Sequence, residues 1–292
     1  MIKKSVITLG TFDGIHKGHK LLINKTLSVA KKNNLKSMVI LLKEPVKKVS
    51  GLLTTYEEKL DEIKSFGVDE IIVIEVPSII LSHTHDEFFD NFLSKTLRVS
   101  EIVCGSNFAF GKNRKGDIKW LHEKAKNSGI KIDIVELLKN TSKQAISSSY
   151  IRTLIEKSDV VNAAKLLGRN YSFIGIPFRE KGMGKKLGFP TLNLRVAKNK
   201  LLPKGVYTSF ISQGERIYPS VTNIGIRITF NRGDQIVPET HILNFQGNLK
   251  KSQIKVVILK KIRDEEKFVS IEKLKSRIFK DVSIAMHFFN KK

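Results

Sequence analysis

The pattern of apolar residues changes once along the chain, near residue 157, and this change constrains the fold more than any other feature. Up to this point, short apolar runs alternate with stretches in which apolar residues recur every three or four positions. Ser5–Leu9 and Met38–Leu42 are two such runs, and Leu21, Leu22 and Leu27 lie in the stretch between them. Alternating strands and helices predict an α/β domain with a parallel sheet, which we place at residues 1–157.

Residues 158–292 have a different pattern, because short apolar runs are separated by Gly, Pro, Asn and Gln with few helical stretches between them. Many short strands predict an antiparallel barrel or sandwich. The final segment repeats Ile271, Leu274, Ile278 and Val282 at three- and four-residue steps, which predicts a C-terminal helix. A chain of 292 residues is long enough for two such domains.

The chain is strongly basic, with 52 Lys and Arg against 28 Asp and Glu and a formal net charge of +24. A nucleic-acid-binding surface would use such an excess, because neutralised phosphates release counterions. Here the lysines are scattered and never form a block of five or more, which is more typical of a solvated surface. We therefore expect no dedicated nucleic-acid partner, but a field that attracts anionic small molecules.

Cysteine content and apolar runs favour a cytoplasmic protein. The only cysteine, Cys104, excludes an internal disulfide and a cysteine-rich metal site. No apolar run reaches the roughly 18 residues of a membrane-spanning helix, so no membrane association is expected. The N-terminus enters a strand-like run directly, without the pattern of a signal peptide.

The turn after the first strand, Gly10–His19, is the first candidate site. Gly10 and Gly14 let a ligand approach the backbone, and the helix start that follows offers unpaired N–H groups to an anion. His16 and His19 are three residues apart and are expected to face the same side. This arrangement suits a polyphosphate under attack, whose growing charge it would stabilise. The histidines could instead ligate a metal, although no third ligand lies nearby in the sequence.

A second polar segment, Ser147–Arg152, precedes another helical pattern. The hydroxyls of Ser148 and Ser149 are explained by helix capping alone. Arg152, one turn later, would add a guanidinium clamp for phosphate.

Three motifs, taken together and in order, resemble the N-terminal half of prokaryotic bifunctional riboflavin kinase/FMN adenylyltransferases, or FAD synthetases. His16–His19 is similar to the HxGH signature of nucleotidyltransferases, Cys104–Asp117 to GxNFxFGxxRxGD, and Ser148–Arg152 to the Ser-Ser…Arg element. Leu53–Lys59 also fits this family. One departure is Leu42–Val46, which stands where the family has Phe-x-Pro-His-Pro, in a loop that the resemblance places on the flavin side.

The resemblance implies a Rossmann-like nucleotidyltransferase domain that adenylylates FMN and releases pyrophosphate. His16, His19 and Arg152 would be the catalytic residues, and Asn107 and Phe110 would lie at the flavin. The residues implied in ATP binding are Gly10, Thr11, Phe12, Asp13, Gly14, His16, His19, Asn107, Ser148, Ser149 and Arg152.

Gly182–Asn193 is the candidate site of the second domain. Its three glycines and two lysines could wrap phosphates with backbone N–H groups, although such loops are also common connectors. Thr191 and Asn193 would share one face of a strand and offer the hard oxygen ligands that Mg²⁺ prefers. Glu239, at the head of a predicted strand, could accept a proton from a substrate hydroxyl or could be a solvated edge residue.

Leu187–Asn193 resembles the LGFPTAN motif of flavokinases, and Val221–Arg227 and Glu239–Phe245 resemble two further motifs of that family. The resemblance implies a six-stranded barrel with Glu239 as the base on the riboflavin 5′-hydroxyl and Mg²⁺ on Thr191 and Asn193. The residues implied in ATP binding are Gly182, Gly184, Lys185, Gly188, Pro190, Thr191 and Asn193. Ile228–Phe230 and Leu249–Lys251 depart from the family's pattern.

We therefore predict a two-domain enzyme that phosphorylates riboflavin to FMN with Mg-ATP and then adenylylates FMN to FAD. One alternative is a riboflavin kinase with a degenerate adenylyltransferase domain, because of Lys43, Glu44 and Pro45. The other is a basic nucleic-acid-binding protein on a nucleotidyltransferase fold.

Overall fold

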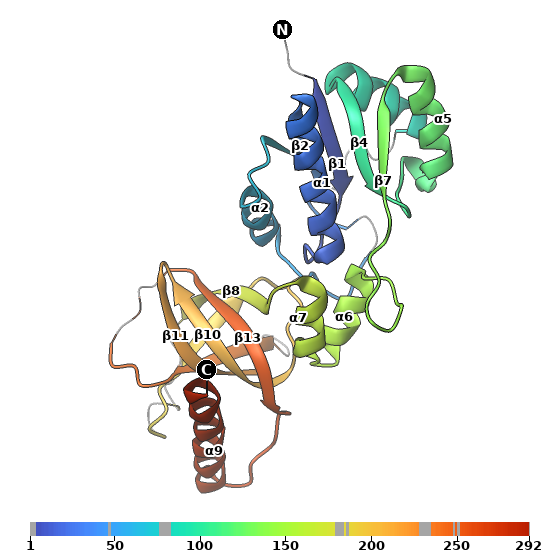
Figure 1. The fold of residues 1–292 in the computed structure, drawn as a ribbon. Helices are drawn as coiled ribbons and strands as arrows, with labels where there is room; N and C mark the ends of the chain where they lie inside the picture. The colour runs from blue at the N-terminus through green and yellow to red at the C-terminus, as the bar shows by residue number, and fades with distance from the viewer. Residues whose placement is uncertain are drawn as a thin grey trace. The chain divides into compact units, whose positions relative to one another are not determined.

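A computed structural model describes residues 4–45, 48–75, 83–178, 184, 187–227, 235–247, 249 and 252–291. The chain forms two compact units (Figure 1). The first comprises Met1–Ser50 and Thr54–Ser148, and the second comprises Gly51–Leu53 and Ser149–Lys292. The boundary of the functional domains at residue 157 stays a prediction.

The first unit is built on a five-stranded parallel sheet in the order β3-β2-β1-β4-β7. Its strands are β1 (Ser5–Gly10), β2 (Lys36–Leu42), β3 (Glu70–Ile74), β4 (Val99–Gly105) and β7 (Lys131–Val135). The parallel sheet predicted from the alternating pattern is thus confirmed.

Helices cover both faces of this sheet, because both faces of its central strands are apolar. On one face, Val39 and Leu41 pack with Ile23 of α1 (Lys17–Asn33) and Ile63 of α2 (Tyr56–Lys64). On the other, Ile40 packs in a cluster with side chains of η1 (Phe88–Thr96) and α5 (Ile118–Ser128).

Two short features of this unit were not predicted from the sequence. The first is α4 (His85–Glu87), which continues directly into the π-helix η1. The second is a small hairpin of β5 (Ala109–Phe110) and β6 (Gly116–Asp117), joined through η2 (Lys112–Arg114). A Cβ added to Gly111 or Gly116 would lie 2.7 or 2.8 Å from an atom of His85, so the hairpin closes around that residue.

The second unit contains a closed antiparallel barrel, as predicted. Its strands, in the order β10-β11-β12-β9-β8-β13, close on themselves. Their bounds are β8 (Tyr171–Phe178), β9 (Leu192–Val196), β10 (Gly205–Gln213), β11 (Arg216–Arg227), β12 (Gln235–Ile242) and β13 (Ile254–Arg263). Two helices, α6 (Ser148–Glu156) and α7 (Val160–Leu167), precede the barrel in the chain.

Hydroxyl groups fill part of the barrel interior. Ser209 Oγ lies 2.8 Å from Ser220 Oγ and 2.7 Å from Thr222 Oγ1, which in turn lies 2.9 Å from Thr240 Oγ1. All four side chains are fully buried, so this chain of hydrogen bonds satisfies them where no water reaches.

The predicted C-terminal helix is α9 (Ile271–Asn290), which packs on the outside of the barrel. Ala285, Val282 and Phe289 contact Val206 and Val221 of the barrel wall. A buried ion pair adds to this packing: both oxygens of Asp281 accept from the guanidinium of Arg263, at 2.8 to 3.1 Å. Among the described residues, no helix combines the length and apolar character needed to cross a membrane.

Gly51–Leu53 is a segment of the second unit that comes from the loop between β2 and α2. Leu52 N–H donates to Asn199 O at 2.7 Å, and Leu201 N–H donates to Leu52 O at 2.9 Å. The buried ammonium of Lys200 donates to Leu53 O at 2.8 Å. Leu52 and Lys200 thus form an isolated parallel β-bridge, which attaches the segment to the second unit.

Candidate active sites

The sheet topology places two of the predicted motifs at one edge of the first unit. β1 and β4 are neighbours, but the chain leaves β1 toward α1 on one face and leaves β4 toward α5 on the other. Ligands of doubly wound sheets bind at such a switch point, beyond the carboxyl ends of the strands. The turn after Gly10 and the segment from Gly105 to Asn107 both begin there.

The turn after β1 adopts backbone angles that most residues avoid. Phe12, Gly14 and Ile15 have φ values of 50°, 83° and 38°. Positive φ is unstrained only for glycine, so Phe12 and Ile15 are held in place by their surroundings. Both side chains are fully buried in the core beneath α1 and α2.

Hydrogen bonds from Thr54 and Ser148 hold this turn. Asp13 Oδ1 accepts from the Thr54 N–H at 3.1 Å, and Gly14 N–H donates to Thr54 Oγ1 at 2.9 Å. Ser148 Oγ donates to the Asp13 carbonyl at 2.8 Å. The buried Asp13 carboxylate therefore accepts a hydrogen bond within the protein. Thr54 stabilises the turn, a role that was not predicted from the sequence.

The two histidines lie together, as their spacing predicts. Their rings stack with centroids 3.6 Å apart and planes 17° apart. His16 is the N-cap of α1, and its Nδ1 accepts from the His19 backbone N–H at 3.3 Å. Since Nδ1 accepts, a neutral His16 carries its proton on Nε2 and can donate it to a ligand.

His19 is held in its neutral form. Burial, the neighbouring His16 and the cation of Lys59 together lower the pKa of His19 well below its usual 6.5. Its Nδ1 is buried and has no hydrogen-bond partner among the residues that the structure describes. A neutral imidazole whose nitrogen lacks a partner can form a hydrogen bond with a polar substrate atom.

The alternative that the histidines ligate a metal lacks further ligands. Among the residues that the structure describes, no group of three or more His, Cys, Asp or Glu side chains could hold a metal ion.

The predicted flavin-side residues follow β4. Asn107 is exposed, and a Cβ on Gly105 would lie 3.3 Å from its Oδ1. Phe110 is only 8% exposed and packs against Phe88 and Trp120, so its contact with flavin stays a prediction. Phe108 stacks on Phe110 and is more exposed, and the sequence analysis did not single it out.

Ser149 and Arg152 lie on α6, in the second unit, whereas the histidine turn lies in the first. Their contact with the triphosphate stays a prediction.

In the barrel, three polar residues share one row across neighbouring strands. Glu239 of β12 pairs with Asn193 of β9 on one side and with Asn223 of β11 on the other. Its neighbour Thr240 faces the interior, so Glu239 lies on the outer face of the barrel. A carboxylate is thus flanked by two amides on one surface.

The prediction that Glu239 lies at the head of a strand is wrong, because β12 begins at Gln235. Pro238 is the reason for the error, since proline inside a run usually marks a strand start or an edge. In the structure, Pro238 pairs with Ile224 within the strand.

The turn before β9 is closely packed around Thr191. Phe189 N–H donates to Gly184 O at 2.8 Å, and a Cβ on Gly184 would lie 2.5 Å from Phe189 O and 3.0 Å from Thr191 Oγ1. His241 Nδ1 donates to Pro190 O at 2.8 Å, which attaches the turn to β12. Gly188 completes the turn with a φ of 88°. The predicted ATP-binding residues Gly182 and Lys185 lie outside the described residues.

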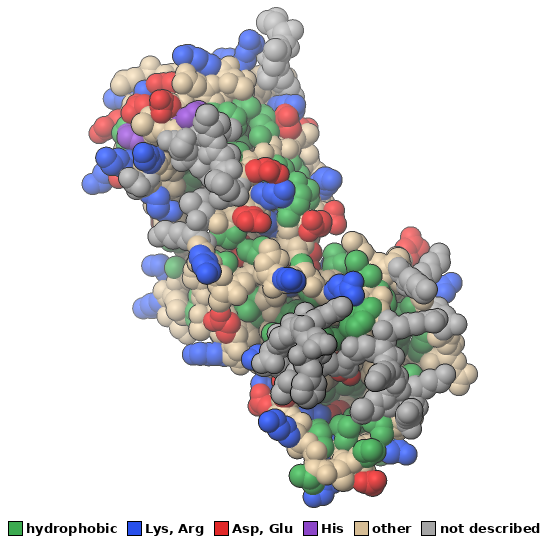
Figure 2. Space-filling view, turned by 180° about the vertical axis from the view of Figure 1, so that it is seen from behind, with side chains coloured by type: hydrophobic (Ala, Val, Ile, Leu, Met, Phe, Trp, Pro, Cys, Tyr) green, Lys and Arg blue, Asp and Glu red, His purple; other side chains and the backbone are tan. Residues whose placement is uncertain are grey.

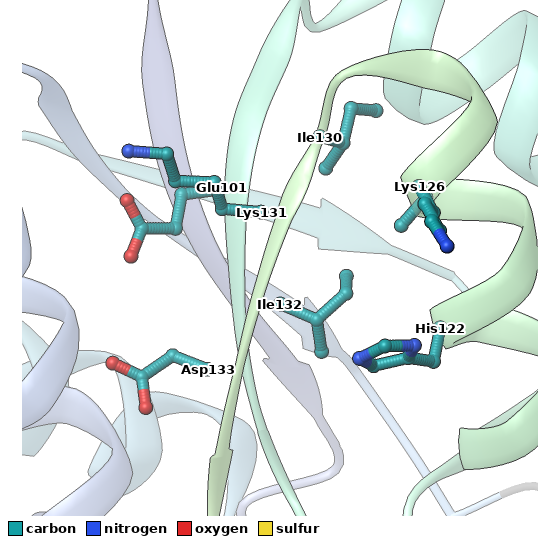
Figure 3. A pocket seen from close by; sticks show the side chains of 8 residues that line it. Glu101, His122, Lys126, Ile130, Lys131, Ile132 and Asp133 are labelled. Atoms are coloured by element: carbon teal, nitrogen blue, oxygen red, sulfur yellow. The ribbon is translucent and has the colours of Figure 1, made fainter.

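A hollow of about 380 Å³ around β7 is not a third candidate site. Figure 3 shows Glu101 and Asp133 on one side of β7 and His122 on the other, because β7 is the edge strand of the sheet. The hollow therefore spans two faces of the sheet. Its lining mixes acidic and basic side chains, so it favours neither an anionic nor a cationic ligand.

The basic residues are spread over the surface. Figure 2 shows Lys and Arg side chains across the visible face, with Asp and Glu side chains among them. This distribution agrees with the scattered lysines of the sequence.

Comparison with known families identifies the chain. A family model described as FAD synthetase matches residues 1–150, and one described as riboflavin kinase matches residues 167–289. The chain belongs to the bifunctional riboflavin kinase/FMN adenylyltransferase family. This family's members are transferases of flavin-cofactor biosynthesis, and the resemblance read from the motifs is confirmed.

Relatives of the same name cover nearly the whole chain. The one from Buchnera aphidicola subsp. Schizaphis graminum is 34% identical over 98% of this chain and 94% of its own length. The one from Bacillus subtilis (strain 168) is 32% identical over 98% and 93%.

A crystal structure from Streptococcus pneumoniae has the same fold, with a TM-score of 0.87, 28% identity and coverage of 98% of this chain and 95% of that one. That protein is named a macrolide-efflux protein. Both family models and the full-length relatives place this chain among the flavin enzymes instead.

Proposed function

We propose that the first unit adenylylates FMN at the edge of its sheet, and that the stacked His16 and His19 stabilise the phosphates there. In this reaction an FMN phosphate oxygen attacks the α-phosphorus of ATP, the bond to the bridging oxygen breaks, and pyrophosphate leaves. The histidine pair at the start of α1 supports this proposal most directly, since N–H donors and a helix N-terminus meet at one point.

The other residues of this site have supporting roles. Gly10, Thr11 and Gly14 bring backbone close to ATP, and Phe12 and Asp13 shape the turn. Ser148 holds the turn through the Asp13 carbonyl, while Ser149 and Arg152 are assigned to the triphosphate. Asn107 and Phe110 are assigned to the FMN side.

The barrel is proposed to phosphorylate riboflavin. Glu239 accepts the proton of the 5′-hydroxyl, the oxygen forms a bond to the γ-phosphorus of ATP, and ADP leaves. The row of Asn193, Glu239 and Asn223 supports this assignment, because one carboxylate lies between two neutral amides on the outer face of the barrel. The turn from Gly184 to Pro190 would hold the ATP phosphates.

The residues near this row fit a magnesium ion. Thr191 offers a hydroxyl and Asn193 an amide oxygen, and the close approach of Gly184 to Thr191 leaves room there only for a residue without a side chain. When bound with ATP, Mg²⁺ would neutralise phosphate charge. We assign this enzyme to the cytoplasm, which agrees with the buried, unpaired thiol of Cys104.

The assay that tests this proposal supplies riboflavin, ATP and Mg²⁺ to the purified chain and separates FMN from FAD. We expect FMN to appear first and FAD to follow. Accumulation of FMN alone would contradict the adenylyltransferase assignment and favour the alternative of a kinase with a degenerate first domain.

A further inference from the structure

A lysine of α2 contacts the turn that carries the histidines, although the resemblance of Leu53–Lys59 to the family gives it no role. Lys59 is completely buried. Its ammonium donates to three backbone carbonyls: Lys43 O at 2.8 Å, and Thr11 O and Leu42 O at 3.2 Å each. Only a charged ammonium has three protons to give, so this geometry shows Lys59 as a cation.

The three carbonyls belong to two segments of the chain, the turn after β1 and the end of β2 with the loop that follows it. Thr11 begins the turn that carries the histidines, after β1. Leu42 ends β2, and Lys43 begins the loop that departs from the family's pattern on the flavin side. One side chain thus joins the ATP turn to the flavin-side loop.

Two carboxylates, those of Asp13 and Glu44, act electrostatically on the Lys59 ammonium. Burial lowers the pKa of Lys59 below its usual value, while the carboxylates of Asp13 and Glu44 act in the opposite direction. Asp13 belongs to the ATP turn and Glu44 to the flavin-side loop, so each of the two segments contributes a counter-charge. Without the cation, three partly buried carbonyls would lose this common hydrogen-bond donor.

We propose that Lys59 is a positioning residue of the adenylyltransferase site, which holds the ATP turn and the flavin-side loop at one fixed separation. The proposal rests on the proposed function for its catalytic consequence. Its structural content, the joint ordering of the two loops, stands separately and can be measured without substrate.

The experiment compares Lys59→Met with Lys64→Met in the full chain. Methionine keeps the length of the side chain but removes the charge and all three donors. Lys64 is an exposed lysine of the same helix and controls for the loss of one charge from α2. Lys59→Arg restores the charge with a different donor geometry.

The first measurement is hydrogen–deuterium exchange of the substrate-free chain. In Lys59→Met we expect residues 11–15 and 42–45 to exchange faster together, while β4 and the barrel exchange as in the unchanged chain. Lys64→Met should exchange as the unchanged chain does, and Lys59→Arg should recover part of the protection. Unchanged protection of either loop in Lys59→Met, or faster exchange throughout the sheet, would overturn the proposal.

The second measurement is steady-state kinetics of both reactions. Because a displacement of about 1 Å can reduce a rate by about 10²-fold, we expect kcat/KM for FMN adenylylation to fall by about that factor in Lys59→Met. KM should rise for both ATP and FMN, and riboflavin phosphorylation should stay within about twofold. Adenylylation within about twofold of the unchanged chain would overturn the proposal. If the unchanged chain makes no FAD, the proposed function fails, and the exchange data alone decide the role of Lys59.

Discussion

A histidine is an uncommon choice for the N-cap of a helix, because Asn, Asp and Ser satisfy the first backbone N–H groups better. His16 occupies that position in α1, and its Nδ1 accepts from the His19 N–H at a long 3.3 Å. We interpret this as a loss of helix stability in exchange for ligand binding, since the Nε2–H of a histidine cap can also donate to phosphate.

His16→Asn tests this interpretation. The better cap should leave the free energy of unfolding of the first unit unchanged or raise it by up to about 1 kcal/mol. Adenylylation of FMN should fall by about 10²-fold, because a donor to the reacting phosphates is lost. Denaturant unfolding and an FAD assay measure the two effects. A large loss of stability with unchanged adenylylation would contradict the interpretation.

His19 should make the stability of the first unit depend on pH. Its pKa is lowered in the folded chain, so below pH 6.5 the unfolded chain binds more protons than the folded one at this site. Protonation then favours unfolding, and stability should fall as the pH drops below 6.5.

The imidazole NMR signals of His19 in the substrate-free chain report this directly. They should remain those of the neutral ring well below pH 6.5, and His19→Asn should weaken the pH dependence of unfolding. A titration of His19 at or above its usual pKa would contradict the account.

Glu239→Gln should remove the phosphorylation of riboflavin without affecting the adenylylation of FMN. Glutamine keeps the shape of the side chain on β12 but cannot accept a proton. Phosphorylation of riboflavin should fall by about 10² to 10⁴-fold, the usual contribution of a general base. Adenylylation of added FMN should be unchanged, and an equal loss of both reactions would argue against the assignment.

At the scale of elements, a buried ion pair adds to the apolar packing that docks α9 on the barrel. The side chains of Arg263 and Asp281 are 11% and 3% exposed, whereas nearby Asp264, paired with Lys261, is 85% exposed. Removing one partner of a buried pair leaves the other charge unpaired.

We therefore expect Asp281→Ala to lower the free energy of unfolding of the barrel by about 3–5 kcal/mol. Asp264→Ala, which breaks the exposed pair, should cost about 0–1 kcal/mol. Denaturant titrations followed by far-ultraviolet circular dichroism compare the two. Equal effects of the two substitutions would show that the buried pair does not hold the helix.

Most elements could be predicted from periodicity, because long amphipathic patterns leave few alternatives. The strands before α1 and α2, the barrel strands from Gly205 onward and the terminal helix are examples. The two-residue strands β5 and β6 were missed because they are too short for a periodic signal. The π-helix at Phe88–Thr96 was also missed, although Phe88 and Phe92, like Phe89 and Leu93, are four residues apart. Pro238 hid the first half of β12 for a different reason, since proline within a strand is rare.

Site residues could be predicted where reactive side chains occur at the spacing of a regular helix or strand. The pairing of His16 with His19 follows from helix geometry, and the structure shows it. Lys59 gave no such signal, because a lysine in the acidic segment Glu57–Glu62 is typical of a solvated helix face. Its burial arises from carbonyls that are 16 to 48 residues away in sequence, which only the fold brings together.

At the scale of the whole molecule, we assign two different reactions, adenylylation and phosphorylation, to the two compact units of one chain. We propose one phosphate-binding turn for each unit, one after β1 and the other before β9. The central claim is therefore that either reaction can be removed without the other.

The measurement that tests this claim follows FMN and FAD in time for three chains: the unchanged one, Glu239→Gln and His16→Asn. From riboflavin, ATP and Mg²⁺, the unchanged chain should form FAD, His16→Asn should stop largely at FMN, and Glu239→Gln should form little of either. Supplied with FMN, Glu239→Gln should form FAD at the unchanged rate. Loss of both reactions in each variant, or FAD formation that ignores His16, would contradict the account.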